Sequence, residues 1–226
     1  MTHRKLGTLT IGQAPRADIT PILDAHVDGA LPRIHAGVLD GLTRGEVAEQ
    51  FAPKPGAPVL ITRMLDGSSI VIDKQATERA ARARLAALEA EGCTTILMLC
   101  TGAFETLHCE RARLVEPDRI LPPTVAAAIQ DAQVGIIVPL AEQISSEAEK
   151  WAALPRRPIY AAASPYADDQ GALETAARDL AARGADILLM DCMGFVEAHR
   201  RIIAAASGLP VILSNALIAK VVSEIV

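Results

Sequence analysis

Two cysteines, Cys100 and Cys192, are the residues of this chain whose type and position best suit chemistry. Each follows a short apolar run, and a glycine stands two residues after each. A residue just past the carboxyl end of a buried parallel strand lies where open α/β sheets bind their ligands. If a helix begins there, its free N–H groups lower the pKa of the thiol below ~8.5, and the thiolate can act as a base. The two cysteines are therefore our candidate catalytic residues.

The segments around the two cysteines repeat one another. Ala90 to Glu105 aligns with Ala182 to Glu197 without a gap, and the leucine, methionine, cysteine and glycine of the motif are identical in both copies. Each copy predicts a helix that ends at a glycine, then a buried strand, then the cysteine, then the start of another helix. The repeat indicates two similar halves, and both thiols would reach one cleft if the halves face each other.

The elements that must position these cysteines follow from the composition and the hydrophobic pattern. Half of the residues are hydrophobic and only 3% are aromatic, which favours helices packed on a parallel sheet. Strand-like runs alternate with helical patterns, so we predict a doubly wound α/β fold. We place the first half at 1–123 and the second at 124–213, with the last helix, 214–226, a candidate to pack back on the first. Asp66-Gly67 predicts a hairpin that could serve as an edge, a lid or a subunit contact.

Charge and cysteine spacing limit the partners. The net charge is −5 and the arginines are scattered, so the chain lacks the basic surface of nucleic-acid-binding proteins. No Cys-x-x-Cys pair occurs, and we predict no metal. The apolar run after the first five residues is too short for the hydrophobic part of a signal sequence or for a membrane span. This favours a cytoplasmic protein with free thiols. We expect a small-molecule ligand, and a homodimer through the hairpin is left open.

Loops at the predicted strand ends supply candidate substrate-binding residues. Arg16 has a planar guanidinium that can hold both oxygens of a carboxylate, although a solvated loop arginine fits its position equally well. Asp18 is a candidate cap for the helix that follows it. The full set of candidates is Gln13, Arg16, Thr101, Gly102, Ser164, Tyr166, Met193, Gly194 and Asn215.

These motifs resemble the AroM family, which belongs to the wider aspartate/glutamate racemase superfamily. The resemblance runs nearly end to end through Ile11 to Arg16, Leu99 to Gly102, Val138 to Leu140 with Glu142-Gln143, and Asp191 to Phe195. The resemblance to the superfamily is narrower and depends on the two strand-end cysteines.

The resemblance implies two flavodoxin-like halves related by a pseudo-twofold axis, with the active site between them and no cofactor. One thiolate of such racemases removes the proton alpha to a carboxylate, and the other thiol returns a proton on the opposite face. Carried over, Cys100 and Cys192 are that pair. The chain departs from amino-acid racemases in the loop Gly12 to Arg16 and in Met193-Gly194, where those enzymes have Thr-His. Related members isomerise maleate, racemise hydantoins or decarboxylate malonates.

Several hypotheses therefore remain. The leading one is a cofactor-independent racemase or isomerase that acts beside a carboxylate. The alternatives are a decarboxylase on the same scaffold, a non-catalytic protein that binds or senses a small carboxylate, and a redox protein with a reversible disulfide between Cys100 and Cys192. Cys93 and Cys109 fit the simpler interpretation of small buried hydrophobic residues.

Overall fold

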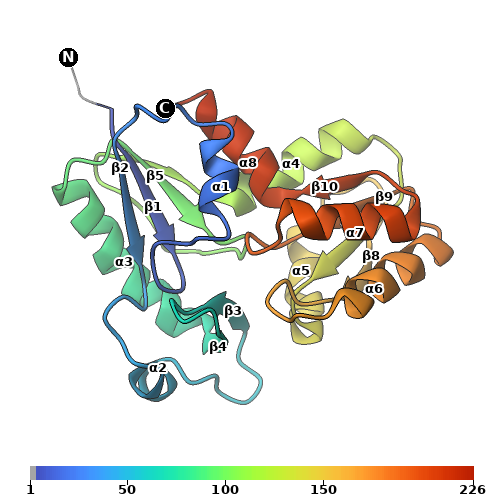
Figure 1. Cartoon of the computed structure of the whole chain (residues 1–226), viewed down its shortest axis with the longest axis horizontal. Coiled ribbons are helices and arrows are strands. Elements are labelled where there is room, and N and C mark those ends of the chain that lie inside the picture. The colour runs from blue at the N-terminus through green and yellow to red at the C-terminus, as the bar shows by residue number, and fades with distance from the viewer. Residues whose placement is uncertain (1–3) are drawn as a thin grey trace. The chain divides into compact units, whose positions relative to one another are not determined.

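The computed structural model of the chain describes residues 4–226 and divides into two compact units (Figure 1). The N-terminal unit comprises the chain up to Pro117 together with Ala219–Val226, and the C-terminal unit comprises Asp118–Ile218. Two hydrogen bonds join the end of the chain to the N-terminal unit: Arg4 Nη1 donates to the carbonyl of Val226, and Arg113 Nη1 donates to the carbonyl of Ile225.

The N-terminal unit is built on a parallel sheet. Its strands, in spatial order, are β2 (Arg33–Gly37), β1 (Leu6–Thr10), β5 (Thr95–Leu99) and β6 (Arg113–Val115). Its helices are α1 (Thr20–Asp24), α2 (Arg44–Gln50) and α3 (Lys74–Ala90). Every residue of β1 and β5 is buried, as expected for strands that are covered on both faces. Figure 1 shows α1 and α3 on opposite faces of this sheet.

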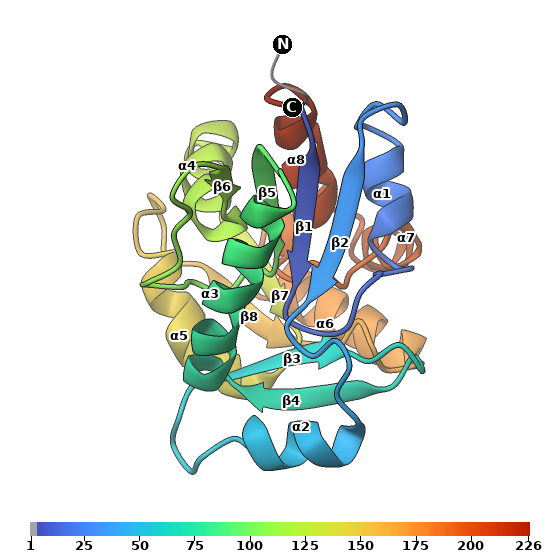
Figure 2. The same cartoon turned by 90° about the vertical axis from the view of Figure 1, so that its left-hand side faces the viewer.

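The predicted hairpin is present in the N-terminal unit. It consists of the antiparallel strands β3 (Val59–Arg63) and β4 (Ser69–Asp73). Figures 1 and 2 both show it beyond the carboxyl ends of β1 and β2. Its attachment is direct, because the amide of Gln13 donates to the carbonyl of Arg63 at 3.2 Å. The hairpin therefore lies at the sheet edge where ligands of α/β proteins bind.

The C-terminal unit contains a second parallel sheet. Its strands, in spatial order, are β10 (Val211–Leu213), β9 (Ile187–Met190), β7 (Val134–Val138) and β8 (Ile159–Ala162). Its helices are α4 (Pro117–Ile129), the 3-10 turn η1 (Ala141–Gln143), α5 (Ile144–Lys150), α6 (Gln170–Ala182), α7 (Glu197–Ser207) and the first part of α8 (Ser214–Ser223). The helices α6 and α7 pack on each other, α6 against β7 and β8 and α7 against β10.

The two sheets have the same topology. Taken in chain order, the strands of each sheet lie in the spatial order second, first, third, fourth, which is how flavodoxin-like sheets begin. The third strand of each sheet, β5 or β9, precedes a candidate cysteine. The glycine that precedes each of these strands, Gly92 or Gly184, has a positive φ of 86° or 89° and ends the preceding helix in the left-handed conformation. The prediction of an α/β fold with two similar halves is confirmed.

Two predictions of local structure are wrong. No helix follows Cys100, because the segment from Thr101 to Ala112 is bound to side chains of α3 instead. Glu89 Oε1 accepts the amides of Arg111 and Ala112 at 2.6 and 2.7 Å. Glu105 therefore lies in a loop.

The second error concerns Pro122-Pro123, which we predicted as a boundary before a helix. Both prolines lie inside α4, which begins at Pro117. A proline cannot donate a backbone hydrogen bond, but its fixed φ is compatible with a helix. Here the two missing bonds do not end the helix.

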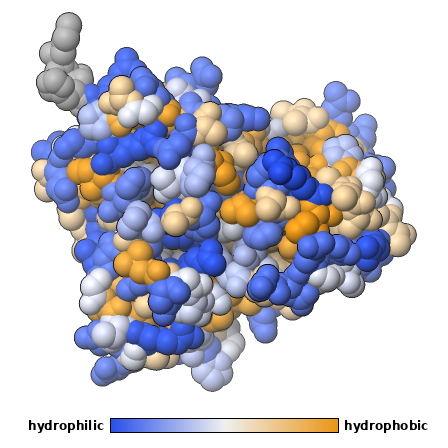
Figure 3. Space-filling model, viewed as in Figure 1, coloured by the Kyte–Doolittle hydropathy of each residue, from blue (hydrophilic) through white to orange (hydrophobic). Residues whose placement is uncertain are grey.

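The face of the chain drawn in Figure 3 has a mixed surface. Figure 3 shows hydrophobic residues in small groups among hydrophilic ones. Among residues 4–226, the exposed large hydrophobic side chains are Leu65, Val71 and Ile225, of which the first two belong to the hairpin and its turn. No helix in this range is both long enough and apolar enough to cross a membrane.

Candidate functional site

The loops that follow Cys100 and Cys192 share one hydrogen bond to the sulfur. The amide of Gly102 donates to Sγ of Cys100, and the amide of Gly194 donates to Sγ of Cys192, both at 3.4 Å. A hydrogen bond of this kind favours the charged form of its acceptor, so each loop stabilises a thiolate. Both cysteines are free thiols. The expected helix N-terminus is absent after Cys100, and after Cys192 the helix begins only at Glu197, so in both loops the glycine amide, and not a helix N-terminus, is a donor to the sulfur.

The Cys100 loop is covered by the hairpin. Cys100 is 8% exposed and Thr101 is 6% exposed. A Cβ atom placed on Gly102 would lie 3.1 Å from Cδ2 of Leu60 in β3. The sequence left three roles open for the hairpin: an edge, a lid or a subunit contact. Within this unit the hairpin covers the Cys100 loop.

Gln13, a predicted substrate ligand, braces the loop after β1. Its Nε2 donates to the carbonyls of Leu39 at 3.2 Å and Leu42 at 2.9 Å, and its Oε1 accepts the amide of Leu65 at 2.8 Å. Both amide hydrogens are therefore used within the unit. Asp40, which the sequence did not single out, holds the same loop, because its carboxylate accepts the amides of Ala14 and Gly37.

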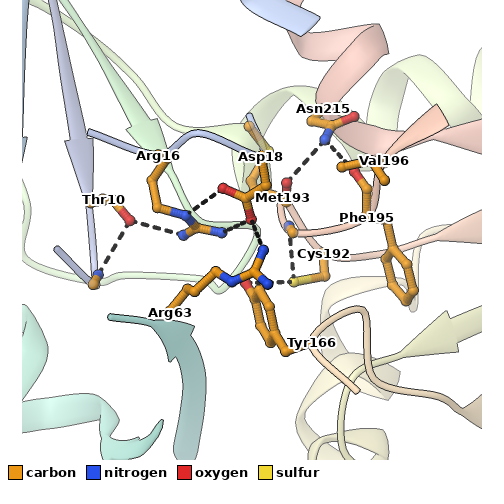
Figure 4. Close-up of polar contacts among 12 residues, drawn as sticks. Thr10, Arg16, Asp18, Arg63, Tyr166, Cys192, Met193, Phe195, Val196 and Asn215 are labelled. Carbon is orange, nitrogen blue, oxygen red and sulfur yellow. Dashed lines mark hydrogen bonds and ion pairs between the residues drawn. The ribbon is translucent and has the colours of Figure 1, made fainter. Parts of the chain in front are cut away.

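Arg16 is buried, with 4% exposure, and its guanidinium is engaged by Asp18 (Figure 4). Nε and Nη2 donate to the two carboxylate oxygens of Asp18 at 2.9 and 2.7 Å, and Nη1 donates to Oγ1 of Thr10 at 3.1 Å. The prediction that Asp18 caps α1 is wrong, since Ile19 occupies the N-cap and no side chain caps it. A substrate carboxylate could use the same face of Arg16 only by displacing Asp18, so the carboxylate clamp stays a prediction.

On the side of Cys192, the fold brings the side chain of the predicted residue Tyr166 close to the thiol. Its hydroxyl lies 3.8 Å from Sγ of Cys192 (Figure 4). The ring packs on Gly194, where a Cβ atom would lie 2.4 Å from the hydroxyl oxygen. Oγ of Ser164 accepts the amide of Tyr166 at 3.2 Å and fixes the turn between them.

Asn215, at the start of α8, donates hydrogen bonds to the backbone of the loop that follows Cys192. Asn215 is 1% exposed, and Nδ2 donates to the carbonyls of Met193 at 2.9 Å and of Phe195. The neighbouring Ser214 donates to the carbonyl of Met190 at 2.7 Å. Both side chains donate hydrogen bonds to backbone carbonyls near the cysteine. Asn215 therefore positions the Cys192 loop in this structure, and the carbonyl of Met193 is one of the acceptors.

A cluster of buried charges, which we call the Lys150 cluster, adjoins Cys192 and was missed by sequence reasoning. Lys150 Nζ lies 2.6 Å from Oδ2 of Asp191 and 3.3 Å from Oε2 of Glu147. Nε1 of Trp151 donates to the same Asp191 oxygen at 2.8 Å. The side chains of Lys150 and Asp191 are 3% and 0% exposed. The available signal was Asp191 itself, a carboxylate directly after an apolar strand and before a candidate cysteine.

Burial and mutual attraction shift the ionisation of this cluster. Burial raises the pKa of Glu147 to about 8, against the opposing effect of Lys150. Burial acts to lower the pKa of Lys150, but the carboxylates of Asp191 and Glu147 outweigh it and raise that pKa. Near neutral pH the cluster therefore holds a charged Lys150 and a protonated Glu147.

The other two thiols have different surroundings. Burial raises the pKa of Cys93, and burial together with Glu89 and Glu116 raises the pKa of Cys109 to about 11. Both thiols are protonated at neutral pH, which agrees with their interpretation as structural residues. Within residues 4–226, no group of three or more histidine, cysteine, aspartate or glutamate side chains could hold a metal ion.

Comparison with known proteins identifies the family. The model of the AroM protein family matches residues 6–226. The chain belongs to the AroM family. A comparison with curated protein sequences finds no match.

Solved structures share the fold of this AroM family member at low sequence identity. Glutamate racemase from Aquifex pyrophilus is 13% identical with a TM-score of 0.62, covering 98% of this chain and 84% of that one. Allantoin racemase from Pseudomonas fluorescens is 15% identical with a TM-score of 0.59, covering 97% and 89%. Arylmalonate decarboxylase is 11% identical with a TM-score of 0.57, covering 98% and 91%. The AroM chain thus shares the fold of these two racemases and of this decarboxylase.

Proposed function

We propose that this protein is a cofactor-independent racemase or isomerase in which Cys100 and Cys192 transfer protons at the carbon alpha to a carboxylate of a small substrate. The observation that carries the proposal is the matched pair of strand-end thiols. Each follows the third strand of a sheet of the same topology, and each accepts the amide of the glycine two residues on at 3.4 Å. Two thiols with the same local support suit two proton-transfer roles.

The proposed chemistry uses a base and an acid on one carbon. A thiolate takes the alpha proton, the electron pair of the C–H bond passes to the substrate carboxylate as an enolate, and the other thiol donates a proton to the opposite face. The first sulfur ends protonated and the second ends as a thiolate, so the protein is ready for the reverse direction. Inversion requires the two thiols to reach opposite faces of the same carbon.

The developing charge on the carboxylate needs hydrogen-bond donors. Hydroxyl groups belong to both cysteine regions: Thr101 directly follows Cys100, and the hydroxyl of Tyr166 lies 3.8 Å from Sγ of Cys192. We propose these two as donors to the substrate. Gly102 and Gly194 serve the sulfurs through their amides, while Gln13, Ser164, Met193 and Asn215 position the loops. Arg16 joins the substrate site only if a ligand replaces Asp18.

The test is proton exchange followed by NMR. The protein is incubated in D2O with amino acids, hydantoins, hydroxy acids and substituted malonates, and the signal of each alpha hydrogen is followed. We expect loss of this signal for one compound class, and loss of that exchange in both Cys100→Ser and Cys192→Ser. Cys109→Ser is the matched control and should exchange as the wild type does. Unchanged exchange in either of the two site variants would overturn the proposal.

The same experiment separates the alternatives. A decarboxylase would release carbon dioxide from a malonate and would incorporate a single deuteron, with one of the two cysteines dispensable. A binding or regulatory protein would show a ligand-dependent rise in melting temperature without exchange. The presence of both a decarboxylase and racemases among proteins of this fold is the reason to include malonates in the panel.

A further inference from the structure

The Lys150 cluster combines several uncommon features at one position. A lysine, an aspartate and a glutamate, contributed by α5 and by the end of β9, meet within salt-bridge distance in a buried region. The aspartate directly precedes Cys192. The backbone amide of Asp191 donates to the carbonyl of Ile137 at 3.0 Å, which fixes this junction to the neighbouring strand β7. The proposed mechanism gives these charges no role.

Buried charges at this position have an electrostatic consequence for the adjacent sulfur. An unpaired Asp191 carboxylate would oppose a thiolate on the next residue, because like charges disfavour each other's charged forms. Lys150 cancels this effect while it is paired with Asp191. If Glu147 also becomes charged, Lys150 must serve two carboxylates, and the cluster carries a net negative charge. Buried interactions of this kind are weakly screened by salt.

The ionisable groups around Glu147 come from every element packed near it. Lys150 lies on the same helix, Asp191 follows β9, and Tyr160 of β8 donates its hydroxyl to the carbonyl of Glu147 at 3.3 Å. Asp118 of α4 also acts on Lys150. The pKa of Tyr160 is raised, first by burial and then by the two carboxylates, so tyrosine stays neutral where Glu147 titrates. Glu147 is therefore the group of the cluster that changes charge near neutral pH.

We propose that Glu147 and Lys150 are positioning residues that set the ionisation of the Cys192 thiol through the carboxylate of Asp191. This inference deepens the proposed function, on which its relevance to catalysis rests. The ionisation itself can be measured without any substrate. A negative result in the exchange experiment would therefore leave the test of this cluster valid.

The test is the pH dependence of thiol alkylation in the full chain. The rates at which iodoacetamide modifies Cys192 and Cys100 are measured separately, by mass spectrometry of their peptides, from about pH 6 to about pH 10. The variants are Glu147→Gln and, as matched control, Glu149→Gln, an exposed glutamate on the same helix. Far-UV circular dichroism checks that each variant is folded.

We expect the wild-type rate at Cys192 to rise less steeply above about pH 8 than a single ionisation predicts, because Glu147 becomes charged there. In Glu147→Gln the profile should follow one ionisation, with a rate at high pH about two- to threefold above wild type. The change at Cys100 should be smaller, and Glu149→Gln should match wild type. A Cys192 profile that is the same in Glu147→Gln and wild type overturns the proposal. So does an equal change in Glu149→Gln, or a Cys192 that is unreactive over the whole range.

A second measurement covers the case in which Glu147→Gln does not fold. Wild-type protein labelled with carbon-13 in the glutamate carboxyl groups is titrated by NMR. One glutamate signal should titrate near pH 8, together with the inflection in the alkylation rate of Cys192. The absence of any glutamate that titrates above about pH 7 contradicts the proposal.

Discussion

The surroundings of the two cysteine loops differ although the same hydrogen bond supports both sulfurs. In both loops a glycine amide donates to the sulfur at 3.4 Å. The glycine after Cys100 faces an apolar neighbour, Leu60 of the hairpin, whereas the glycine after Cys192 faces the ring and hydroxyl of Tyr166. The repeat therefore conserves the support of the sulfur and leaves the adjoining chemistry to other parts of each unit. Two thiols on equivalent strands need not have equivalent acidity.

Each unit also contains a buried ion pair near the carboxyl edge of its sheet, at a different place. In the N-terminal unit the pair is Arg16–Asp18, which follows the first strand β1. In the C-terminal unit it is Lys150–Asp191, which adjoins the cysteine-bearing strand β9. At the position equivalent to Asp191, the first copy of the repeat has Leu99. Only the second of these cysteines therefore directly follows a buried charge.

The largest effect is expected from Lys150→Met. The substitution leaves Asp191 buried without its partner, and breaking a buried pair in this way costs about 3–5 kcal/mol of unfolding free energy. Urea unfolding followed by fluorescence measures this directly, because Trp151 is the single tryptophan and contacts Asp191. Lys150→Met combined with Asp191→Asn should recover most of the loss. A single variant within about 1 kcal/mol of wild type would contradict the assignment of a buried pair.

The next largest effect is expected from breaking the Arg16–Asp18 ion pair of the N-terminal unit. Arg16→Met should cost about 2–4 kcal/mol, somewhat less than Lys150→Met, since Arg63 Nη1 lies 3.8 Å from Asp18 and keeps part of the compensation. Thermal unfolding and hydrogen exchange of β1 report the change. Arg63→Met is the matched control; its side chain is 37% exposed, so we expect a loss below about 1 kcal/mol. Equal losses of unfolding free energy in Arg16→Met and Arg63→Met would show that the two hydrogen bonds from Arg16 to Asp18 are not the important contact.

Alanine at the two glycines sharpens the comparison of the loops. At Gly194 a Cβ atom would lie 2.4 to 2.6 Å from ring and hydroxyl atoms of Tyr166, whereas at Gly102 it would meet Leu60 at 3.1 Å. We expect Gly194→Ala to cost about 2 kcal/mol and Gly102→Ala below about 1 kcal/mol. Removing the ring with Tyr166→Ala should largely cancel the effect of Gly194→Ala in a double-mutant cycle. Additive losses would contradict the contact between this ring and the glycine.

The last effect is the pH dependence of stability in the C-terminal unit. Burial raises the pKa of folded Glu147 from 4.5 to about 8, so between these values the folded chain keeps a proton that the unfolded chain releases. Stability measured by Trp151 fluorescence should therefore be highest at the acidic end of that window and fall as pH rises to about 8. Glu147→Gln should flatten this slope. An unchanged slope in the variant would assign the dependence to another group.

Much of the fold could be predicted because its strongest signals are local. Three continuous apolar runs between turn signals form strands in the structure, as such runs favour: Val134–Val138, Ile187–Met190 and Val211–Leu213. The segment after Cys100 was predicted wrongly as a helix. Its amides bind Glu78 and Glu89 of α3, and contacts between distant segments of this kind leave no periodic signal.

Part of the candidate site could be predicted because its signals are also local in the sequence. The repeat pointed to both cysteines, and Tyr166 was selected because it follows a strand. The partners of these residues were not predictable. Asp18 was expected to cap a helix and instead binds Arg16, and nothing in the local sequence distinguished Lys150 from an ordinary helix lysine until the fold placed it beside Asp191.

The sequence by itself determined the two α/β halves, the positions of the cysteines at strand ends and the glycines that follow them, because hydrophobic period, glycine conformation and internal repetition are properties of neighbouring residues. Only the tertiary structure decided that the hairpin covers the Cys100 loop, that Asp18 occupies the guanidinium of Arg16, and that a lysine and two carboxylates are buried beside Cys192. Those contacts join segments far apart in the chain, and the free energy of a buried charge depends on which partner the fold brings within reach.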